Sequence, residues 1–204
     1  PVGNPQGRII SAVTYESSGT KYLVGINRDA SAKYYNVMRW TFAPDGKTLA
    51  SLVGTVLVNQ ISDLGYSDLY SFRDLDIGKV GDNMILFIAN RRSSNAQTHV
   101  LAVNISNDPK TLFWRKTGAD LGLPNDSYPS GVAVDQPRGI VFIFFDGSLQ
   151  VLGLNMADGS VATGPFTYDT AGGRAMAVDY AGNIYTTSQS TEHVRMWAPP
   201  GPNA

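Results

Sequence analysis

Two carboxylates stand one residue apart in the segment Asp74-Leu75-Asp76, and this spacing is the clearest pattern in the sequence that could support chemistry. Because side chains alternate between the two faces of a β-strand, Asp74 and Asp76 would lie on the same face. Such a pair could act as a general acid and base, or it could bind a cation. The simpler interpretation, which we prefer, is that the two aspartates form salt bridges with the neighbouring Arg73 or Lys79.

The other residue types that often catalyse reactions give weaker patterns. His99 and His193 are each expected at the start of a strand, but in different repeats of the chain, so a surface role is preferred to metal binding or base catalysis. Serine catalysis is not indicated, because there is no Gly-x-Ser-x-Gly elbow and Ser127 and Ser130 lie in a predicted loop without an evident base. The segment Gly78-Lys79-Val80-Gly81 lacks the spacing and the following helix of a phosphate-binding loop.

Arginine and tyrosine residues gather in loops that we expect on one face of the molecule. Arg28 and the pair Arg91-Arg92 fall in loops between the second and third strands of two repeats. Loops carry binding residues more often than the elements that they connect. The sequence therefore predicts a basic, aromatic-lined mouth for a carbohydrate, a peptide or an anionic ligand. Its predicted residues are Arg28, Arg91, Arg92, Tyr66, Tyr70 and Tyr128, with Phe72 beside them.

Two Asn-x-Ser triplets are candidate glycosylation sites, which would agree with an exterior location. Asn125 is the better candidate because it lies in a proline-flanked loop. Asn104 lies near the end of a predicted strand.

The composition limits the class of protein. The 204 residues, with a mass of 22.0 kDa, are enough for one sizeable domain, and 43% hydrophobic against 16% charged residues excludes a disordered chain. The 16 Lys and Arg residues nearly balance the 17 Asp and Glu residues, so neither a nucleic acid nor an anionic membrane is indicated as a partner. The absence of cysteine excludes disulfides and thiolate chemistry.

Two further features of the sequence favour strands joined by turns. Fifteen of the 17 acidic residues are Asp, which suits turns, and the chain has 21 Gly and 11 Pro residues. The longest apolar run, residues 140–145, is too short to span a membrane and fits a buried strand. Since the chain starts without Met and without a signal segment, we expect it to come from a longer or processed polypeptide.

Internal repetition is the main organising signal. Four stretches share one order of elements: an alternating strand, a more apolar strand, a polar loop, a third strand, a turn and a fourth strand, which the last stretch lacks. Units of about 40–50 residues with four strands are typical of β-propeller blades. The sequence therefore predicts a single all-β domain, a β-propeller of about four four-stranded blades with an incomplete last blade and almost no helix. The blades are expected at residues 8–58, 71–118, 130–169 and 173–200, with the fourth strand of the first blade at residues 48–58.

The last blade carries the motif Ala175-Met176-Ala177-Val178-Asp179-Tyr180-Ala181-Gly182-Asn183-Ile184-Tyr185. Over residues 174–199 the sequence resembles the repeat of NHL-type and related bacterial extracellular β-propeller proteins. The motif has a structural reason, because the carboxylate of Asp179 can accept turn amides and Gly182-Asn183 can supply the positive backbone dihedral of a tight hairpin. Asp135 occupies the matching position in the preceding blade, so both aspartates are predicted to be turn residues.

The predicted fold also resembles metal-dependent lactonase-type propellers, which hold one divalent cation at the channel mouth with Glu, Asn and Asp ligands. That resemblance implies a Ca²⁺ or Zn²⁺ site with Glu16, Asp74 and Asp76 as candidate ligands. The sequence departs from the pattern at Ser188-Gln189, where those enzymes usually carry an Asp. A metal-dependent hydrolase is therefore the alternative hypothesis.

The leading hypothesis is a non-enzymatic module without a cofactor, located outside the cell or at its surface, that functions by binding or self-assembly. It rests on the lack of a catalytic constellation, the surface pattern rich in Tyr, Thr, Ser and Asn, and the missing fourth strand. Open strand edges and apolar blade faces invite association. The chain could close as a small ring, belong to a larger ring, or be completed by another chain in a dimer or filament. The expected partner is thus the chain itself or another protein chain.

Overall fold

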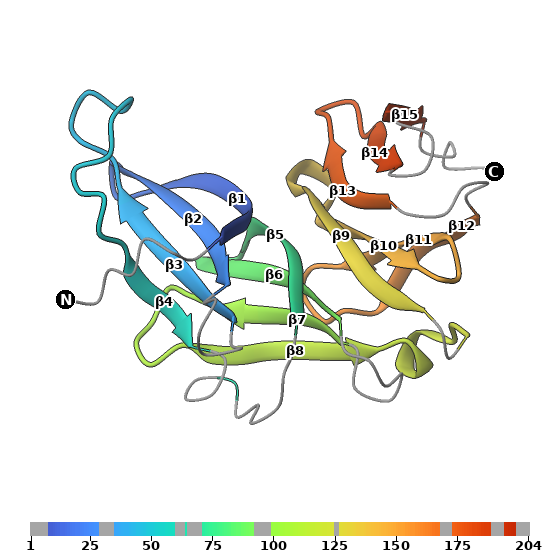
Figure 1. The fold of residues 1–204 in the computed structure, drawn as a ribbon. Coiled ribbons are helices and arrows are strands. Elements are labelled where there is room, and N and C mark those ends of the chain that lie inside the picture. The colour runs from blue at the N-terminus through green and yellow to red at the C-terminus, as the bar shows by residue number, and fades with distance from the viewer. Residues whose placement is uncertain are drawn as a thin grey trace.

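Four antiparallel sheets make up the computed structural model, which describes residues 8–28, 35–59, 64, 71–91, 99–124, 127–167, 173–188 and 194–198 (Figure 1). Sheet 1 contains β1 (Arg8–Ser17), β2 (Thr20–Arg28), β3 (Tyr35–Thr41) and β4 (Thr55–Asn59). Sheet 2 contains β5 (Ser71–Val80), β6 (Asn83–Arg91), β7 (His99–Asn104) and β8 (Thr111–Thr117). Sheet 3 contains β9 (Tyr128–Asp135), β10 (Ile140–Asp146), β11 (Gln150–Asn155) and β12 (Val161–Thr167). Sheet 4 contains β13 (Gly173–Val178), β14 (Ile184–Ser188) and β15 (Val194–Trp197).

Helix is confined, in the described residues, to two single 3₁₀ turns, η2 (Ala119–Leu121) and η3 (Gln136–Arg138). Neither is long or apolar enough to cross a membrane. In every sheet the strands follow one another in chain order, each hydrogen-bonded to the next. This arrangement is the one expected from short alternating strands joined by turns.

The burial of each strand follows from its place in the set of sheets. β6 and β10 are buried almost from end to end, because sheets 2 and 3 have a neighbouring sheet on both faces. Their sequences are accordingly continuous apolar runs. β1 instead alternates, with Val13 and Tyr15 half-buried against the core and Ala12 and Thr14 exposed. Sheet 1 therefore has one covered face and one open face.

The fourth strand of sheet 1 is shorter than predicted, because β4 begins only at Thr55 and not at Thr48. Asp45 holds the preceding segment in a turn, where one carboxylate oxygen accepts the amides of Lys47 and Thr48 at 2.8 and 2.9 Å. The indole of Trp40 then covers Gly54, where a Cβ would lie 2.5 Å from the ring. The residues predicted to begin this strand instead form a turn, and Gly54 packs closely under the ring of Trp40.

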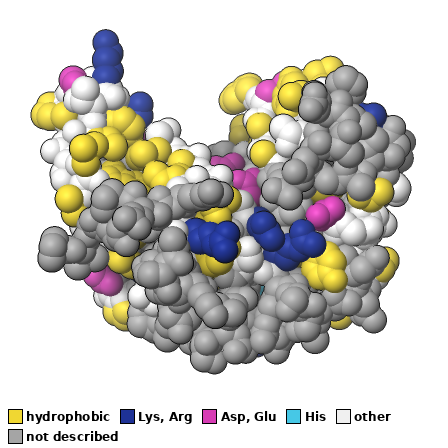
Figure 2. Space-filling model, viewed as in Figure 1, with side chains coloured by type: hydrophobic (Ala, Val, Ile, Leu, Met, Phe, Trp, Pro, Cys, Tyr) yellow, Lys and Arg dark blue, Asp and Glu magenta, His cyan; other side chains and the backbone are white. Residues whose placement is uncertain are grey.

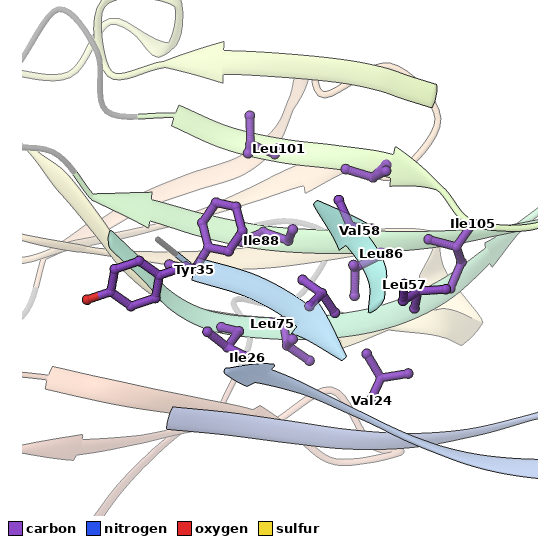
Figure 3. Close-up of a cluster of buried hydrophobic side chains, with 13 residues drawn as sticks. Val24, Ile26, Tyr35, Leu57, Val58, Leu75, Leu86, Ile88, Leu101 and Ile105 are labelled. Atoms are coloured by element: carbon purple, nitrogen blue, oxygen red, sulfur yellow. The ribbon is translucent and has the colours of Figure 1, made fainter. Parts of the chain in front are cut away.

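Three apolar clusters fill the junctions between consecutive sheets. The first joins sheets 1 and 2, and Figure 3 shows its side chains pointing toward one another from strands of both sheets, among them Val24, Ile26, Leu75 and Ile88. The second joins sheets 2 and 3, and the third joins sheets 3 and 4. The core is therefore divided between the junctions, and each junction depends on two sheets.

The innermost strands set the order of the sheets around an arc. β1 packs against β5, β5 against β9, and β9 against β13. Figure 1 shows sheets 1 and 4 at the two ends of this arc with an opening between them, and Figure 2 shows the opening as a notch in the molecular surface. The described residues thus form an open arc and not a small closed ring.

Candidate functional site

The last residue of the second strand stands at the same end of that strand in each of the four sheets. Arg28 ends β2, Arg91 ends β6, Asp146 ends β10 and Ser188 ends β14, so the four hold equivalent positions in successive sheets. Figure 2 shows basic side chains gathered over the middle of the viewed face. Arg28 and Arg91, which the sequence predicts at one mouth, end the second strands of sheets 1 and 2.

Each of these arginines lies over a tyrosine ring. The guanidinium of Arg91 lies 4.7 Å from the ring centre of Tyr128, and that of Arg28 lies 5.9 Å from the ring centre of Tyr35. Ser71 donates a hydrogen bond to the Tyr35 hydroxyl at 3.2 Å. A cation over an aromatic face is held by the ring quadrupole. The mouth thus presents two ordered pairs of one guanidinium and one phenol.

Arg91 is also paired with an acid from the next sheet. Its Nη1 lies 3.2 Å from Oδ2 of Asp146, and the two side chains are 35% and 24% exposed. Asp146 therefore offsets the charge of Arg91, while both groups still reach solvent. We define the mouth by Arg28, Tyr35, Arg91, Tyr128 and Asp146 and refer to these five residues as the Arg–Tyr mouth.

Several predicted site residues lie outside the described residues. They are Arg92, Tyr66 and Tyr70 of the predicted mouth, the sequon residue Asn125, and His193.

The carboxylates of Asp74 and Asp76 accept hydrogen bonds from backbone amides of sheet 3. These bonds, and not the predicted salt bridges with Arg73 or Lys79, position the two side chains. Asp74 accepts hydrogen bonds from the Ser11 hydroxyl, from its neighbour Leu75 and from the amide of Val132 at 2.9 Å.

Asp76 repeats this arrangement one step along the strand. It accepts the amides of Ile77 and of Val134, each at 2.8 Å. The two acids lie on one face of β5, as predicted, and they fasten sheet 2 to sheet 3.

Burial governs the ionisation of both acids. Asp74 is 7% exposed, and this burial raises its pKa to about 6, although hydrogen bonds from Ser11 and from the amides of Val132 and Leu75 oppose the shift. Burial also raises the pKa of Asp76, against the amides of Val134 and Ile77. A buried carboxyl group is harder to ionise because its charged form loses water.

The candidate metal ligands do not converge. Glu16 is exposed near the far end of β1, opposite Lys21. It lies five residues beyond Ser11, which touches Asp74, a separation of about 16 Å along a strand. Over the described ranges, no three His, Asp or Glu side chains are close enough to share a metal ion.

Comparison with solved structures identifies the architecture. The β-propeller domain of Cps50 (Swd1) from Myceliophteria thermophila matches with a TM-score of 0.54 and 10% identity, over 95% of this chain and 52% of that one. The fold is a β-propeller. A Bacteroides thetaiotaomicron protein of unknown function matches with a TM-score of 0.58 and 10% identity, over 95% of this chain and 42% of that one. A gluconolactonase from Xanthomonas campestris matches with a TM-score of 0.53 and 16% identity, over 88% of this chain and 59% of that one.

These comparisons confirm the predicted all-β propeller of four blades, the last with three strands. The chain spans about half the length of the propellers that it matches, from 42% to 59%. No family model matches the sequence, and no curated protein does. At such low identities the likeness establishes the fold alone.

Asp135, which ends β9, and Asp179, which follows β13, have different roles. Asp179 follows the motif, because its oxygens accept the amide of Asn183 at 2.8 Å and the Tyr185 hydroxyl at 2.9 Å, while Gly182 adopts a positive φ of 90°. Asp135 stands at the turn that follows β9, just before η3, but its carboxylate does not accept a capping amide there. It is 1% exposed and forms an ion pair of 2.9 Å with Arg138, whose other nitrogen donates to the carbonyl of Ala181 in the last blade.

Burial in the propeller also corrects the predictions for His99 and Ser130. His99 is 6% exposed in β7 and not in a surface loop, and burial lowers its pKa, assisted by the charge of Arg115. Ser130 lies within β9, and its hydroxyl donates to the carbonyl of Phe144.

Asn104 is a poor glycosylation acceptor in this structure. Its amide is 9% exposed, donates to Asn83 at 3.1 Å and accepts the amide of Ser106 at 3.0 Å. An acceptor side chain must reach solvent, so the strand position overrides the sequon.

Sequence reasoning missed Asp146, Tyr35 and Ser11, although the first carried a detectable signal. Asp146 ends the apolar second strand of its blade, as Arg28 and Arg91 end theirs, so an alignment of the repeats would have grouped it with them. The partners Tyr35 and Ser11 carry no such signal, because their roles depend on which blades become neighbours.

Proposed function

We propose that this chain is a non-enzymatic β-propeller module that functions by association with other blades, outside the cell or at its surface. The observation that carries the proposal is that the first and last sheets each expose an apolar face of the kind that is buried at every junction inside the arc. The resemblance of residues 174–199 to NHL-type bacterial extracellular propellers supports the same class of function.

Both outer faces carry exposed apolar side chains. The sheet-1 outer face, as we name it, carries the apolar or small side chains Ile9, Ala12, Thr14, Leu23, Trp40 and Val56, with the charged residues Glu16 and Lys21 opposite each other toward the hairpin end of the face. The sheet-4 outer face consists of Ala175, Ala177, Tyr185, Thr187, Val194 and Met196.

The solvent exposure of the apolar side chains on these faces indicates that the faces are interaction sites. Ile9 and Val56 are 54% and 43% exposed, and Val194 and Met196 are 69% and 61% exposed. Figure 2 shows hydrophobic side chains on sheet 1 beside the opening. Contiguous exposed apolar surface of this kind marks interaction sites. An isolated arc would leave both faces in water, which favours association.

The Arg–Tyr mouth supplies the binding part of the proposed function. Tyr128 is partly exposed and provides a flat apolar surface, whereas Tyr35 is buried and only positions Arg28. The guanidinium groups provide paired donors, and with the Tyr128 ring they suit a carbohydrate or a peptide. The mouth lies at the ends of the blades, so assembly through the outer faces would leave it accessible.

Light scattering across a range of concentrations tests the proposal. We expect a mass above that of the single chain, and we expect the Met196→Asp variant to shift the protein toward the monomer. Tyr180→Ser is the matched control, because Tyr180 is an apolar side chain with 88% exposure in a hairpin turn, outside both faces. A constant monomer at every concentration would contradict association.

Titration with Ca²⁺ or Zn²⁺ separates this proposal from the lactonase-like alternative. We expect no stoichiometric increase in melting temperature. A stabilising ion whose effect is lost in Asp76→Asn or Glu16→Gln would overturn the non-enzymatic proposal and favour the metal-dependent hydrolase.

A further inference from the structure

Every junction inside the arc joins two different kinds of sheet face. On the inner strand β9, Val132 and Val134 point toward sheet 2, while Gly131 points toward sheet 4. On β13, Met176 packs toward sheet 3 and Ala175 is exposed on the opposite side. Each sheet therefore has one face for the preceding sheet and one for the following sheet.

One outer face of the arc is of the kind that contacts a following sheet, and the other is of the kind that contacts a preceding sheet. Sheet 4 lacks a following sheet, so its outer face corresponds to the face that sheet 3 presents to sheet 4. Sheet 1 lacks a preceding sheet, so its outer face corresponds to the face that sheet 4 presents to sheet 3. The sheet-4 outer face therefore suits a sheet-1 outer face and not another copy of itself.

Residue size at the inner strands supports this match. A Cβ at Gly131 would lie 3.2 Å from the Cβ of Met176, so inner strands approach closely at a formed junction. The equivalent positions on the outer faces are Ala175 in sheet 4 and Ala12 in sheet 1, both small and exposed. The next positions along the two strands, Ala177 and Thr14, are also small. The charged pair Glu16 and Lys21 lies one step farther along the sheet-1 face. Two such strands can pack closely.

We propose that the occupant of each outer face is a second copy of this chain, so that two arcs close into one ring of eight blades. This inference rests on the proposed function. In the ring the sheet-1 outer face of each copy packs on the sheet-4 outer face of the other, which gives two identical junctions around a two-fold axis. The length is that expected if a second copy supplies the other half, because the chain spans about half of the propellers that it matches.

Complementation between two variants tests the pairing of faces. Ile9→Asp disables the sheet-1 outer face, and Met196→Asp disables the sheet-4 outer face. In the single chain Ile9 is 54% exposed and Met196 is 61% exposed, so we expect both variants to fold. Burying an unpaired carboxylate is unfavourable, and we expect each variant to weaken dimerisation about 100-fold. Mixing the two variants restores one intact junction, so the mixture dimerises more tightly than either variant alone.

A cysteine cross-link locates the contact. The chain has no cysteine, so introduced thiols report on single positions. Ala12 is equivalent to Met176, and Ala175 is equivalent to Gly131. A Cβ at Gly131 would lie 3.2 Å from the Cβ of Met176. The variants Ala12→Cys and Ala175→Cys could therefore form a disulfide after a small adjustment. We expect the two single variants to cross-link to each other in a mixture and not to themselves. The double variant should give a covalent dimer of defined mass.

The outcomes separate this inference from the function on which it rests. Self-cross-linking of either single variant, or an open-ended series of masses, would overturn the closed ring while leaving association intact. Association that neither Ile9→Asp nor Met196→Asp weakens would also overturn the ring. A protein that stays monomeric throughout would overturn both, and would place the missing blades on a different polypeptide segment.

Discussion

Arg91 and Asp146 end the second strands of neighbouring blades and meet in an ion pair of 3.2 Å across the junction between sheets 2 and 3. Because both side chains reach solvent, water and salt screen the attraction. We expect Asp146→Asn to lower the free energy of unfolding by about 0.5–1 kcal/mol. Urea unfolding in a cycle with Arg91→Met measures the coupling, which should shrink in high salt. A coupling that is unaffected by salt would show that the pair is not electrostatic.

The ionisation of Asp74 predicts a pH dependence of stability. Its pKa of about 6 in the folded chain exceeds the ordinary value of 3.8, so the folded state binds more protons between these values. Stability from this group therefore falls as the pH rises from about 4 to 6 and is then constant. The difference in unfolding free energy between the wild type and Asp74→Asn should decrease over this range by up to about 3 kcal/mol. Urea titrations at several pH values measure it.

Asp45 provides a control of opposite sign. Hydrogen bonds from the Thr48 amide and hydroxyl, and from the Lys47 amide, lower its pKa. Its contribution to stability is present above the ordinary pKa and is lost as the pH falls. Asp45→Asn should therefore lose its effect at low pH, and a common trend in both variants would contradict the assignment to Asp74.

Arg138 compensates a carboxylate that is almost fully buried, that of Asp135. Arg138→Met would leave this group without its ion-pair partner and would remove the hydrogen bond to Ala181. We expect a loss of about 2–3 kcal/mol, reduced from that of a fully buried pair because the arginine is half exposed. Thermal unfolding measures the loss, and the double variant Asp135→Asn/Arg138→Met should recover part of it. No recovery would mean that the bond to Ala181 dominates.

Gly78 lies where sheet 2 packs tightly on sheet 3. A Cβ there would collide with Met156 and lie 2.9 Å from a methyl group of Val134. Gly78→Ala should therefore destabilise the chain by about 1–3 kcal/mol through overpacking. Lys79→Ala, next to it on the same strand with an exposed side chain, is the matched control. Equal melting temperatures for the two variants would refute the close approach.

The sequence predicted those features of the fold that depend on residues close together in the chain. Alternation and repeat order located the strands, and the same order placed Arg28 and Arg91 at equivalent strand ends. The partners of these residues were not predictable, because they come from other blades. Asp74 binds an amide 58 residues away at Val132, and only the packing of one sheet on another creates that contact. The burial of His99 has the same origin.

The open arc has a consequence for how the molecule unfolds. Sheets 2 and 3 are each held at two junctions, whereas sheets 1 and 4 are each held at one. Local opening of a terminal sheet breaks fewer contacts, so its backbone amides should exchange with deuterium sooner than those of β6 and β10. Closing the arc into a ring would abolish its ends, and the four sheets would then become equally slow to exchange. Fraying at the two ends is therefore a property of the isolated chain that assembly would remove.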